Sequence, residues 1–222
     1  MPPRFEVPPS VAAAREIQER LRSRVIRTGS PRWSLVAGVD ASYRGDVGRA
    51  AIVVLDRDFR RVEEVVVEGE IRFPYVPGYL SFREIPLLLE AWRKLRAKPD
   101  LVIVDGQGVA HPRRLGIASH LGVALDLPSI GCAKSRLIGT YDEPAPERGA
   151  RSPLKDGGET IGAALRTRTG TNVVYVSTGH RVSLAAAVRT VLACAPRYRL
   201  PEPQRLADQL TKRPWTSSAN SA

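Results

Sequence analysis

The sequence holds few of the residues that build disulfide frameworks, zinc sites or membrane spans. Its two cysteines, Cys132 and Cys194, have a spacing that fits neither a metal site nor a disulfide framework. No run approaches the roughly 18 consecutive apolar residues of a membrane helix. The N-terminal stretch MPPRFEVPPS lacks the apolar core of a signal peptide. These absences predict a soluble, cytoplasmic protein that has no membrane partner.

Acidic residues are also scarce in relation to basic ones. The chain has 34 Lys and Arg against 23 Asp and Glu, a formal net charge of +11, and 29 of the basic residues are Arg. The planar Arg guanidinium suits phosphate groups, although a bias toward Arg codons would produce the same excess. Because the basic residues are spread along the chain, they predict a folded surface that binds nucleic acid, not a basic tail.

The pattern of apolar residues predicts a mixed α/β sheet with helices on both faces. Three β-rich segments with short links predict an antiparallel meander, and later strands separated by helices predict parallel βαβ units. The predicted strands are 33–43, 50–55, 62–70, 101–104, 129–132, 161–167 and 172–177. The predicted helices are 11–26, 85–95, 115–125, 183–195 and 203–212, while 142–159 is interpreted as a long loop or an irregular hairpin. Without a repeat or an internal boundary, residues 1–222 form one predicted domain with flexible ends at about 1–9 and 216–222.

The stretch LVIVDGQGVAHPRR at 101–114 places a carboxylate at the end of a buried strand. Four apolar residues run into Asp105, and glycines, a histidine and two arginines follow it. In α/β sheets, ligands collect at the carboxyl ends of parallel strands. Asp105 is therefore a candidate site residue, and the glycines beside it would let a ligand approach the backbone.

Two further carboxylates are candidates for the same site. Asp40, in AGVDAS, points away from the apolar face of its strand, and an acid inside a sheet needs a partner or a metal. Glu84, in SFRE, fits a capping box with Ser81, but Pro86 conflicts with a helix that begins there, so capping and metal ligation are both open. Three carboxylates without a Cys or His cluster suit a hard cation, Mg²⁺ or Mn²⁺. Beside phosphate on a basic protein, such a cation predicts phosphodiester hydrolysis.

Six motifs give the chain a resemblance to a known family. They are GVDASY at 38–43, FPYVPGYLSFRE at 73–84, DGQGVAHPRRLGIASHLG at 105–122, IGCAKSRLIG at 130–139, STGHRVSL at 177–184 and, more loosely, PEPQRLAD at 201–208. In this combination and order they resemble endonuclease V, a nuclease that acts on deaminated purines, especially hypoxanthine. The resemblance covers nearly the whole chain and implies an RNase H-like fold, in agreement with the predicted sheet.

The resemblance also implies which residues carry out the reaction. Asp40, Glu84 and Asp105 match the family's metal-binding acids, with Glu84 acting directly or through water. Lys134 matches a lysine near the scissile phosphate, where its charge can stabilise the transition state, although a solvated lysine after a strand is the alternative. Asp208 lies where relatives place an acid or a histidine near the metal. The implied cofactor is Mg²⁺, for which Mn²⁺ can substitute.

Other matching residues would hold the substrate. The segment that looks like the family's wedge is PYVP: Pro74, Tyr75, Val76 and Pro77. The positions that match the family's base pocket are Leu80, Gly106, Gly116 and Ile117. Tyr75 would fill the gap left by a flipped base, although an ordinary turn with a surface tyrosine is the alternative. Gly106 and Gly108 would keep the wall beside Asp105 low enough for that base, although tight turns would also explain these glycines.

Each of the three histidines has its own expected role. His111 follows the metal site closely and is expected to contact phosphate or a metal-bound water. His120, on the next predicted helix, is expected to be a hydrogen-bonded structural residue. His180 precedes the helix cap Ser183 and is expected to help arrange that turn.

The implied activity is that of a Mg²⁺-dependent endodeoxyribonuclease of the deoxyribonuclease V type, acting in DNA repair. It would hydrolyse the second phosphodiester bond 3′ of a deaminated base and leave 3′-hydroxyl and 5′-phosphate ends. The alternatives are an inosine-specific ribonuclease, another RNase H-like nuclease such as a junction resolvase, and a non-catalytic nucleic-acid-binding protein. The intact Asp40, Glu84 and Asp105 argue against the non-catalytic protein, and PYVP with DGQGVAHPRR argues against a resolvase. We expect a monomer whose partner is nucleic acid that contains deaminated bases.

Overall fold

The computed structural model describes residues 5–215, which contain five α-helices and eight strands. The helices are α1 (Val11–Leu21), α2 (Leu80–Lys94), α3 (Ile117–Leu125), α4 (Leu184–Cys194) and α5 (Glu202–Thr211). The strands are β1 (Val36–Arg44), β2 (Val47–Leu55), β3 (Arg61–Glu70), β4 (Leu101–Val104), β5 (Ser129–Ala133), β6 (Arg151–Asp156), β7 (Glu159–Leu165) and β8 (Val174–His180). Every predicted helix and strand is present, with ends that differ by a few residues. Within the described range, none of the helices has the length and hydropathy that a bilayer span requires.

All eight strands form one mixed sheet in the order β3-β2-β1-β4-β5-β8-β7-β6. β1, β2 and β3 pair antiparallel, which confirms the predicted meander. β4 pairs in parallel with both β1 and β5, and α3 makes the crossover from β4 to β5. β1 and β4 therefore point their carboxyl ends toward the same edge of the sheet, where ligands are expected to bind.

The second half of the sheet is antiparallel, and the predicted parallel βαβ unit is β4-α3-β5. β8 pairs antiparallel with β5, and β7 pairs antiparallel with β8 and with β6. The links from β6 to β7 and from β7 to β8 are short and contain no helix, and a parallel crossover needs a dozen or more residues. β6 lies within the segment that was predicted to be a loop or an irregular hairpin, and its register with β7 shifts after Leu154.

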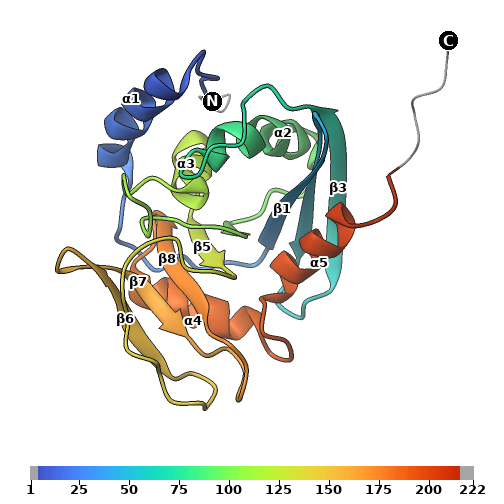
Figure 1. The fold of residues 1–222 in the computed structure, drawn as a ribbon. Helices are drawn as coiled ribbons and strands as arrows, with labels where there is room; N and C mark the ends of the chain where they lie inside the picture. Colours follow the sequence, from blue (N-terminus) through green and yellow to red (C-terminus); the bar gives the residue numbers. More distant parts are fainter. Residues whose placement is uncertain (1–4, 216–222) are drawn as a thin grey trace, which may run out of the picture.

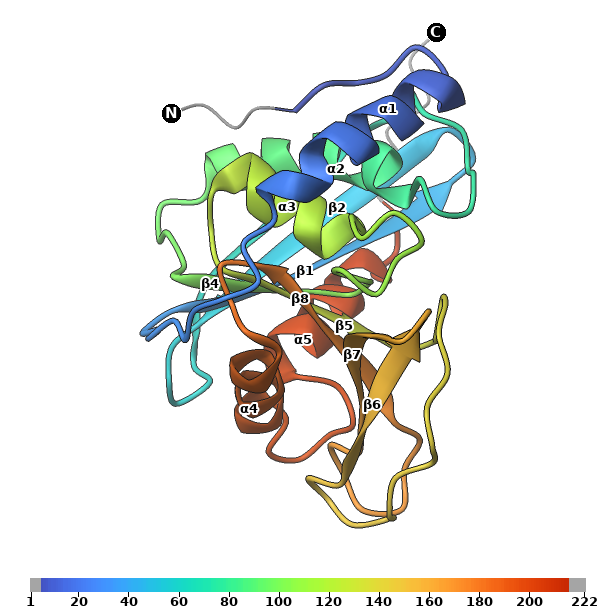
Figure 2. The same cartoon turned by 90° about the vertical axis from the view of Figure 1, so that its left-hand side faces the viewer.

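Helices cover both faces of the sheet, so an apolar core lies on each side (Figures 1 and 2). α1, α2 and α3 lie on one side, and α4 and α5 lie on the other. The residues of β1 alternate between the two cores: Ala37 and Val39 pack with α2 and α3, and Val36 packs with α4 and α5. The same alternation directs Asp40 toward α5.

Helix α2 begins earlier than a capping box at Ser81 requires. Its N-cap is Tyr79, and Ser81 lies inside the helix, where its Oγ is 3.0 Å from Nδ1 of His120. The capping alternative for Glu84 is therefore wrong, and Pro86 lies inside the helix. The hydrogen bond to Ser81 gives the buried His120 the structural role that was predicted.

The N-terminal segment packs on the α2 side of the sheet. The ring of Phe5 lies 6.0 Å from that of Phe82 and 5.0 Å from that of His120, between centroids, so Phe5 packs against both α2 and α3. Within the predicted flexible segment 1–9, Phe5 and Pro8 are packed, whereas Glu6, Val7 and Pro9 are exposed. α1 ends at Leu21 and continues as a short 3-10 turn to Arg24, short of the predicted end at 26. The other residues predicted to be flexible, 1–4 and 216–222, lie outside the described residues.

Candidate active site

Three carboxylates from distant parts of the chain meet at one edge of the sheet. Asp40 lies in β1, Asp105 directly follows β4, and Asp208 lies in α5. One oxygen atom of each lies within 4.8 Å of the others, and we call these residues the acid cluster. Val39 pairs with Val104 in the parallel register, so Asp40 and Asp105, which follow them, are neighbours.

Helix α5 carries Asp208 to the strands, and its last turn also holds Asp40. Oγ1 of Thr211 donates a hydrogen bond to Oδ2 of Asp40 at 2.5 Å, and Oγ of Ser42 donates to the carbonyl of Thr211 at 3.0 Å. At the other end of the helix, Nε2 of Gln204 donates to the carbonyl of Cys132 at 3.0 Å. α5 is therefore attached to both β1 and β5, which fixes its acid beside the strand ends.

The ammonium group of Lys134 lies between two members of the acid cluster. Its Nζ is 2.5 Å from Oδ2 of Asp105 and 2.6 Å from Oδ1 of Asp208. Burial lowers the pKa of Lys134, but the two carboxylates outweigh burial and raise the pKa overall. Burial likewise raises the pKa of Asp208, but the ammonium groups of Lys134 and Lys212 outweigh it and lower the pKa overall. Lys134 is thus a fixed positive charge, which argues against a freely solvated lysine.

The acid cluster fits a hard divalent cation. Its donors are carboxylate oxygens without His or Cys in the group, which is the donor set that Mg²⁺ and Mn²⁺ prefer. Burial, together with the charges of Asp105 and Asp208, raises the pKa of Asp40 to about 6, against the opposing hydrogen bond from Thr211 and charge of Lys134. Crowded carboxylates of this kind lose their mutual repulsion when a cation binds between them. The residues present therefore suit the cofactor that the sequence predicts.

Glu84 lies deeper than the acid cluster. It is only 7% exposed, its carboxylate accepts a hydrogen bond from the hydroxyl of Tyr43, and the guanidinium of Arg83 stacks 4.6 Å from the Tyr43 ring centroid. Burial raises the pKa of Glu84 to about 8; the Tyr43 hydrogen bond opposes the shift, and the charges of Asp40 and Asp105 add to it. Glu84 is not among the three acids whose oxygens lie within 4.8 Å of one another, which favours a contact with a metal through water.

The raised pKa of the buried Glu84 predicts that Glu84→Gln gains stability as the pH rises when no metal is bound. Unfolded Glu84 loses its proton near its ordinary pKa of 4.5, whereas the folded group keeps it until about 8. A rise in pH between these values therefore favours the unfolded wild type, and Gln removes this dependence. Because each pKa unit corresponds to about 1.4 kcal/mol, we expect the variant's excess in free energy of unfolding to grow by several kcal/mol across this window.

Urea unfolding of the chelator-treated protein at about pH 5 and about pH 8 measures this difference. Glu90→Gln is the matched control, because Glu90 is on the same helix but half-exposed and paired with Lys94 at 3.0 Å. Its effect should stay within about 0.5 kcal/mol at both pH values. If the stability that Glu84→Gln gains over the wild type is not larger at about pH 8 than at about pH 5, the pKa of Glu84 is not raised.

A cavity of about 410 Å³ opens beside the acid cluster, and Asp105 and Lys134 form part of its wall. The rest of the wall comes from α1, from the segment between β3 and α2 with the start of α2, and from the loops that follow β4 and β5 with the start of α3. All four predicted base-pocket residues line this cavity, which we call the base cavity: Leu80, Gly106, Gly116 and Ile117. Three of the four predicted wedge residues line it too, namely Tyr75, Val76 and Pro77, whereas Pro74 does not.

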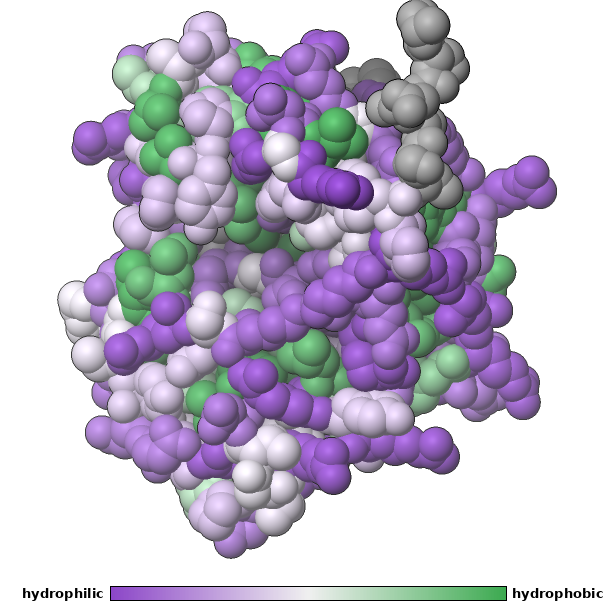
Figure 3. All heavy atoms as spheres, turned by 45° about the vertical axis from the view of Figure 1, so that its right-hand side comes forward, coloured by the Kyte–Doolittle hydropathy of each residue, from purple (hydrophilic) through white to green (hydrophobic). Residues whose placement is uncertain are grey.

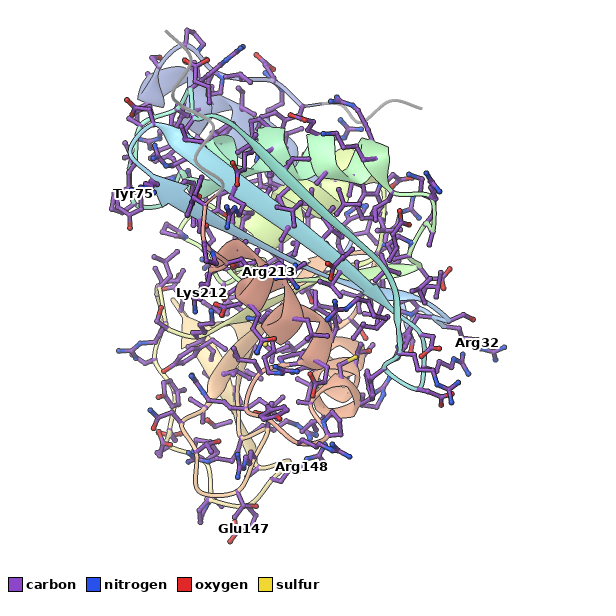
Figure 4. All side chains as sticks on the ribbon, turned by 90° about the vertical axis from the view of Figure 1, so that its right-hand side faces the viewer. Arg32, Tyr75, Glu147, Arg148, Lys212 and Arg213 are labelled. Carbon is purple, nitrogen blue, oxygen red and sulfur yellow. The ribbon has the colours of Figure 1, made fainter. Side chains whose placement is uncertain are left out.

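The ring of Tyr75 stands at the rim of the base cavity. It is 71% exposed and points outward at the edge of the molecule, on the same side as Lys212 and far from Arg32 (Figure 4). A tyrosine exposed to this extent contributes little to a core, so the ring is free to contact a ligand. On the face shown in Figure 3, hydrophilic side chains predominate and hydrophobic ones are scattered, which suits a charged ligand better than a hydrophobic partner.

Two histidines make contacts that their expected roles did not include. Nε2 of His111 donates to the carbonyl of Gly78 at 2.9 Å, and Nδ1 accepts from the amide of Arg113 at 3.2 Å. Burial lowers the pKa of His111 to about 4, so the neutral ring holds the backbone after the wedge and has no nitrogen left for phosphate. His180 accepts from the amide of Ile26 at 3.2 Å, which holds the segment before β1. Its Nε2 lies 3.3 Å from Oδ1 of Asp126, which also accepts a hydrogen bond from Arg181 in the turn before α4.

The two glycines after Asp105 have different surroundings. Gly106 lines the base cavity as predicted, and a Cβ there would lie 2.5 Å from Cγ2 of Ile117, so glycine keeps this part of the wall thin. A Cβ on Gly108 would lie 2.0 Å from the carbonyl oxygen of Thr178 in β8. Gly108 therefore allows close packing between the loop and β8, and it does not form the pocket wall that was predicted.

Three residues that contact the site were missed by sequence reasoning. Tyr43 holds Glu84, and its place in the GVDASY motif three residues after Asp40 was a signal that could have identified it. Thr211 and Gln18 lie outside the matching motifs, in α5 and α1. Neither has a local pattern that predicts a contact with the site, because each contact depends on how its helix docks.

Comparisons with known proteins agree with one another. The family model for endonuclease V matches residues 16–209. The chain is 57% identical over 205 residues to endonuclease V of Roseiflexus sp. (strain RS-1), covering 91% of this chain and 92% of the relative. The crystal structure of endonuclease V from Streptomyces avermitilis superposes with a TM-score of 0.90 at 46% identity, covering 93% of each chain.

A third comparison is with a nucleic-acid complex. Endonuclease V of Ciona intestinalis, solved with a 24mer DNA that contains an inosine followed by a ribo-adenosine, superposes with a TM-score of 0.80 at 29% identity. The match covers 90% of this chain and 95% of that one. These neighbours confirm that the sheet described above is the RNase H-like fold predicted from the sequence.

Proposed function

Because this chain belongs to the endonuclease V family, we propose that it is a metal-dependent endonuclease that acts on deaminated purines in nucleic acid. The observation that carries this proposal is the meeting of the acid cluster with a cavity that has an exposed tyrosine at its rim. The cavity's 410 Å³ lies in the usual range of small-ligand sites, about 300–1,000 Å³. The net charge of +11 supports a polyanionic substrate.

We propose that Asp40, Asp105 and Asp208 hold Mg²⁺, or Mn²⁺ in its place, and that Glu84 supports the site through water. When bound, such a cation activates water and stabilises negative charge on the phosphate. Lys134 lies beside the same carboxylates, and its ammonium group would stabilise the charge that develops on the phosphate in the transition state.

The base cavity is proposed to hold the damaged base after it leaves the stack. Gly106 and Gly116 expose backbone groups to the ligand, and Leu80 and Ile117 supply apolar contacts. An enzyme that reads a base in this way must open the stack and fill the gap. Tyr75 is proposed to fill that gap, because its exposed ring stands at the rim.

The surroundings of Tyr75 support a rigid wedge. Pro74 and Pro77 restrict the backbone on either side of the Tyr75–Val76 pair. Val76 packs against the apolar cluster of Phe73, Phe82 and residues of α1, and this packing holds the segment in place. A ring held in this way loses little conformational freedom when it enters a stack.

Inosine is the proposed lesion, and the inosine in the Ciona complex supports it. We propose that the enzyme hydrolyses the second phosphodiester bond 3′ of the lesion and leaves 3′-hydroxyl and 5′-phosphate ends. Inosine in RNA is a second candidate substrate, favoured by the ribo-adenosine that follows the inosine in that complex. All of the proposed groups come from one chain, which supports a monomeric enzyme.

Matched strands test the proposed function. DNA and RNA oligonucleotides that differ only in one inosine or adenine are incubated with the protein and Mg²⁺, and cleavage is followed over time. We expect the inosine strands to be cut rapidly and the adenine strands to be cut far more slowly. Equal cleavage of both strands, or cleavage that continues in excess chelator, would contradict the proposal.

Replacement of Tyr75 tests the wedge. Tyr75→Ala should weaken binding of inosine strands by about 1–3 kcal/mol, because the stacking contact is lost. Binding of undamaged strands should barely change, since phosphate contacts dominate it. Tyr75→Phe keeps the ring and should behave like the parent protein. Competition binding to matched inosine and adenine strands measures both variants, and full discrimination by Tyr75→Ala would show that residues 74–77 are only a turn.

A further inference from the structure

The carbonyl of Gly78, directly after the wedge segment 74–77, is the meeting point of three hydrogen-bond donors. His111 Nε2 lies 2.9 Å from this oxygen, Nη2 of Arg113 lies 2.8 Å from it, and Nε2 of Gln18 lies 3.0 Å from it. Two of these donors come from the loop after β4, and the third comes from α1. The end of the wedge is thus tied to two other parts of the chain.

Gln18 also contacts Arg113 and the backbone at Leu115. Its Oε1 accepts a hydrogen bond from Nε of Arg113, and its Nε2 lies 3.5 Å from the carbonyl of Leu115 as well as 3.0 Å from that of Gly78. The residue is 1% exposed, although it lies on α1, an otherwise amphipathic surface helix. A buried amide that uses both its donor and its acceptor groups fixes its neighbours in one arrangement.

The network also includes a cation–π contact with an aromatic ring. The guanidinium of Arg113 stacks 4.2 Å from the centroid of the Tyr79 ring, and Tyr79 is the N-cap of α2. Arg113 therefore holds the start of α2 from one side while it holds Gly78 and Gln18 from the other. Together these contacts leave little freedom for the backbone between the wedge and α2.

The contacts of Gln18 connect the wedge segment with the wall of the base cavity. Gly78 follows the wedge, and Leu115 precedes Gly116 and Ile117 of the base-cavity wall. Gln18, Gly78 and Leu115 all line the base cavity themselves. A single side chain therefore bridges the wedge and the wall of the cavity, without belonging to the acid cluster.

We propose that Gln18 is a positioning residue that sets the wedge relative to the base cavity and so determines how well inosine is distinguished from normal bases. The inference rests on the proposed function, because it assumes that the cavity receives a base. It assigns to α1 a part in substrate selection. Gln18 acts through the backbone at Gly78 and Leu115, and the cleavage chemistry at the acid cluster does not depend on it directly.

Gln18→Met tests this role, because it keeps the length of the side chain and removes both hydrogen-bonding groups. The ratio of kcat/KM for an inosine strand to that for the matched adenine strand should fall by about tenfold. A 2-aminopurine placed next to the inosine, whose fluorescence rises when the stack opens, should report less opening with the variant. Gln18→Glu keeps the acceptor for Arg113 but removes the amide donors, so its ratio should fall as well. Glu16→Met, at an exposed position of the same helix, is the control, and its ratio should equal that of the parent protein.

The possible results distinguish a failure of the Gln18 inference from a failure of the proposed function. The ratio compares two substrates with one enzyme preparation, so partial unfolding of a variant lowers both rates and leaves the ratio unchanged. A parent protein that prefers inosine, with Gln18 variants that keep the same ratio and the same fluorescence rise, would overturn the positioning role alone. A parent protein without any preference for inosine would overturn the proposed function, and the inference with it.

Discussion

Asp105→Asn should lower the rate of inosine-strand cleavage by about a thousandfold or more, because loss of a direct ligand to the metal removes several kcal/mol of transition-state stabilisation. Asn keeps the shape of the side chain, but a neutral amide binds a hard cation far more weakly than a carboxylate does. Asp40→Asn should show a loss of the same order, since Asp40 and Asp105 end neighbouring parallel strands and belong to one cluster.

Single-turnover cleavage with saturating Mg²⁺ measures these losses separately from strand binding. Asp142→Asn is the matched control, because Asp142 is exposed and lies outside the acid cluster. It should cleave at the parent rate. Binding of inosine strands should persist in both acid variants, since removal of a negative charge near phosphate does not weaken the contact. Near-normal turnover by either acid variant would contradict the assignment of the acid cluster as the metal site.

Lys134→Met should produce the second large loss, about a hundredfold to a thousandfold in kcat. The ammonium group is the positive charge that stands between Asp105 and Asp208, and methionine replaces it with an uncharged chain of similar length. Removal of that charge leaves the carboxylates more negative, so the variant should bind Mg²⁺ at least as tightly as the parent. The lost rate should therefore not return when Mg²⁺ is added.

Cleavage rates over a range of Mg²⁺ concentrations distinguish the two roles that Lys134 could have. A rate that remains low at every concentration fits a lysine that stabilises the reacting phosphate. A rate that recovers fully with Mg²⁺ would show that Lys134 only holds the acids in place, and it would contradict the proposed role. Lys94→Met on the outer part of α2 is the control, because Lys94 is exposed and pairs only with Glu90 among the described residues.

The first half of the sheet could be predicted from the sequence because its signals are local. Short links between β-rich segments indicated the meander, and an apolar strand that ends on Asp105 indicated a site at a strand end. The pairing of β8 with β5 could not be predicted in the same way, because it joins segments about 45 residues apart with no helix to signal a crossover. The antiparallel second half follows from that pairing.

The site shows the same division between local and long-range information. Asp40, Asp105 and, with capping as an open alternative, Glu84 were identified from the residues themselves, whereas Asp208 needed the family resemblance. Thr211 shows why: it contacts Asp40 from 171 positions away, and only the docking of α5 brings it there. Gln18 is similar, since its contacts with Gly78 and Leu115 arise from the docking of α1.

Two residues show how a local pattern can mislead. Ser81 and Glu84 have the spacing of a capping box, but α2 begins before Ser81, and the hydroxyl bonds to His120 instead. The sequence could not show this, because the competing partner comes from α3. His111 follows Asp105 closely, yet burial and two hydrogen bonds turn its ring toward the backbone after the wedge. In both cases a tertiary contact decides the role of the side chain.

The most direct test of the central claim is to map the cleaved bond in a 5′-labelled DNA strand that contains one inosine, with Mg²⁺ present. The account predicts a single cut at the second phosphodiester bond 3′ of the inosine, with 3′-hydroxyl and 5′-phosphate ends. The same strand with adenine in place of inosine should be cut far more slowly, as should the inosine strand with Asp105→Asn. Cuts scattered along both strands, or a cut that does not move when the inosine is moved, would contradict the account.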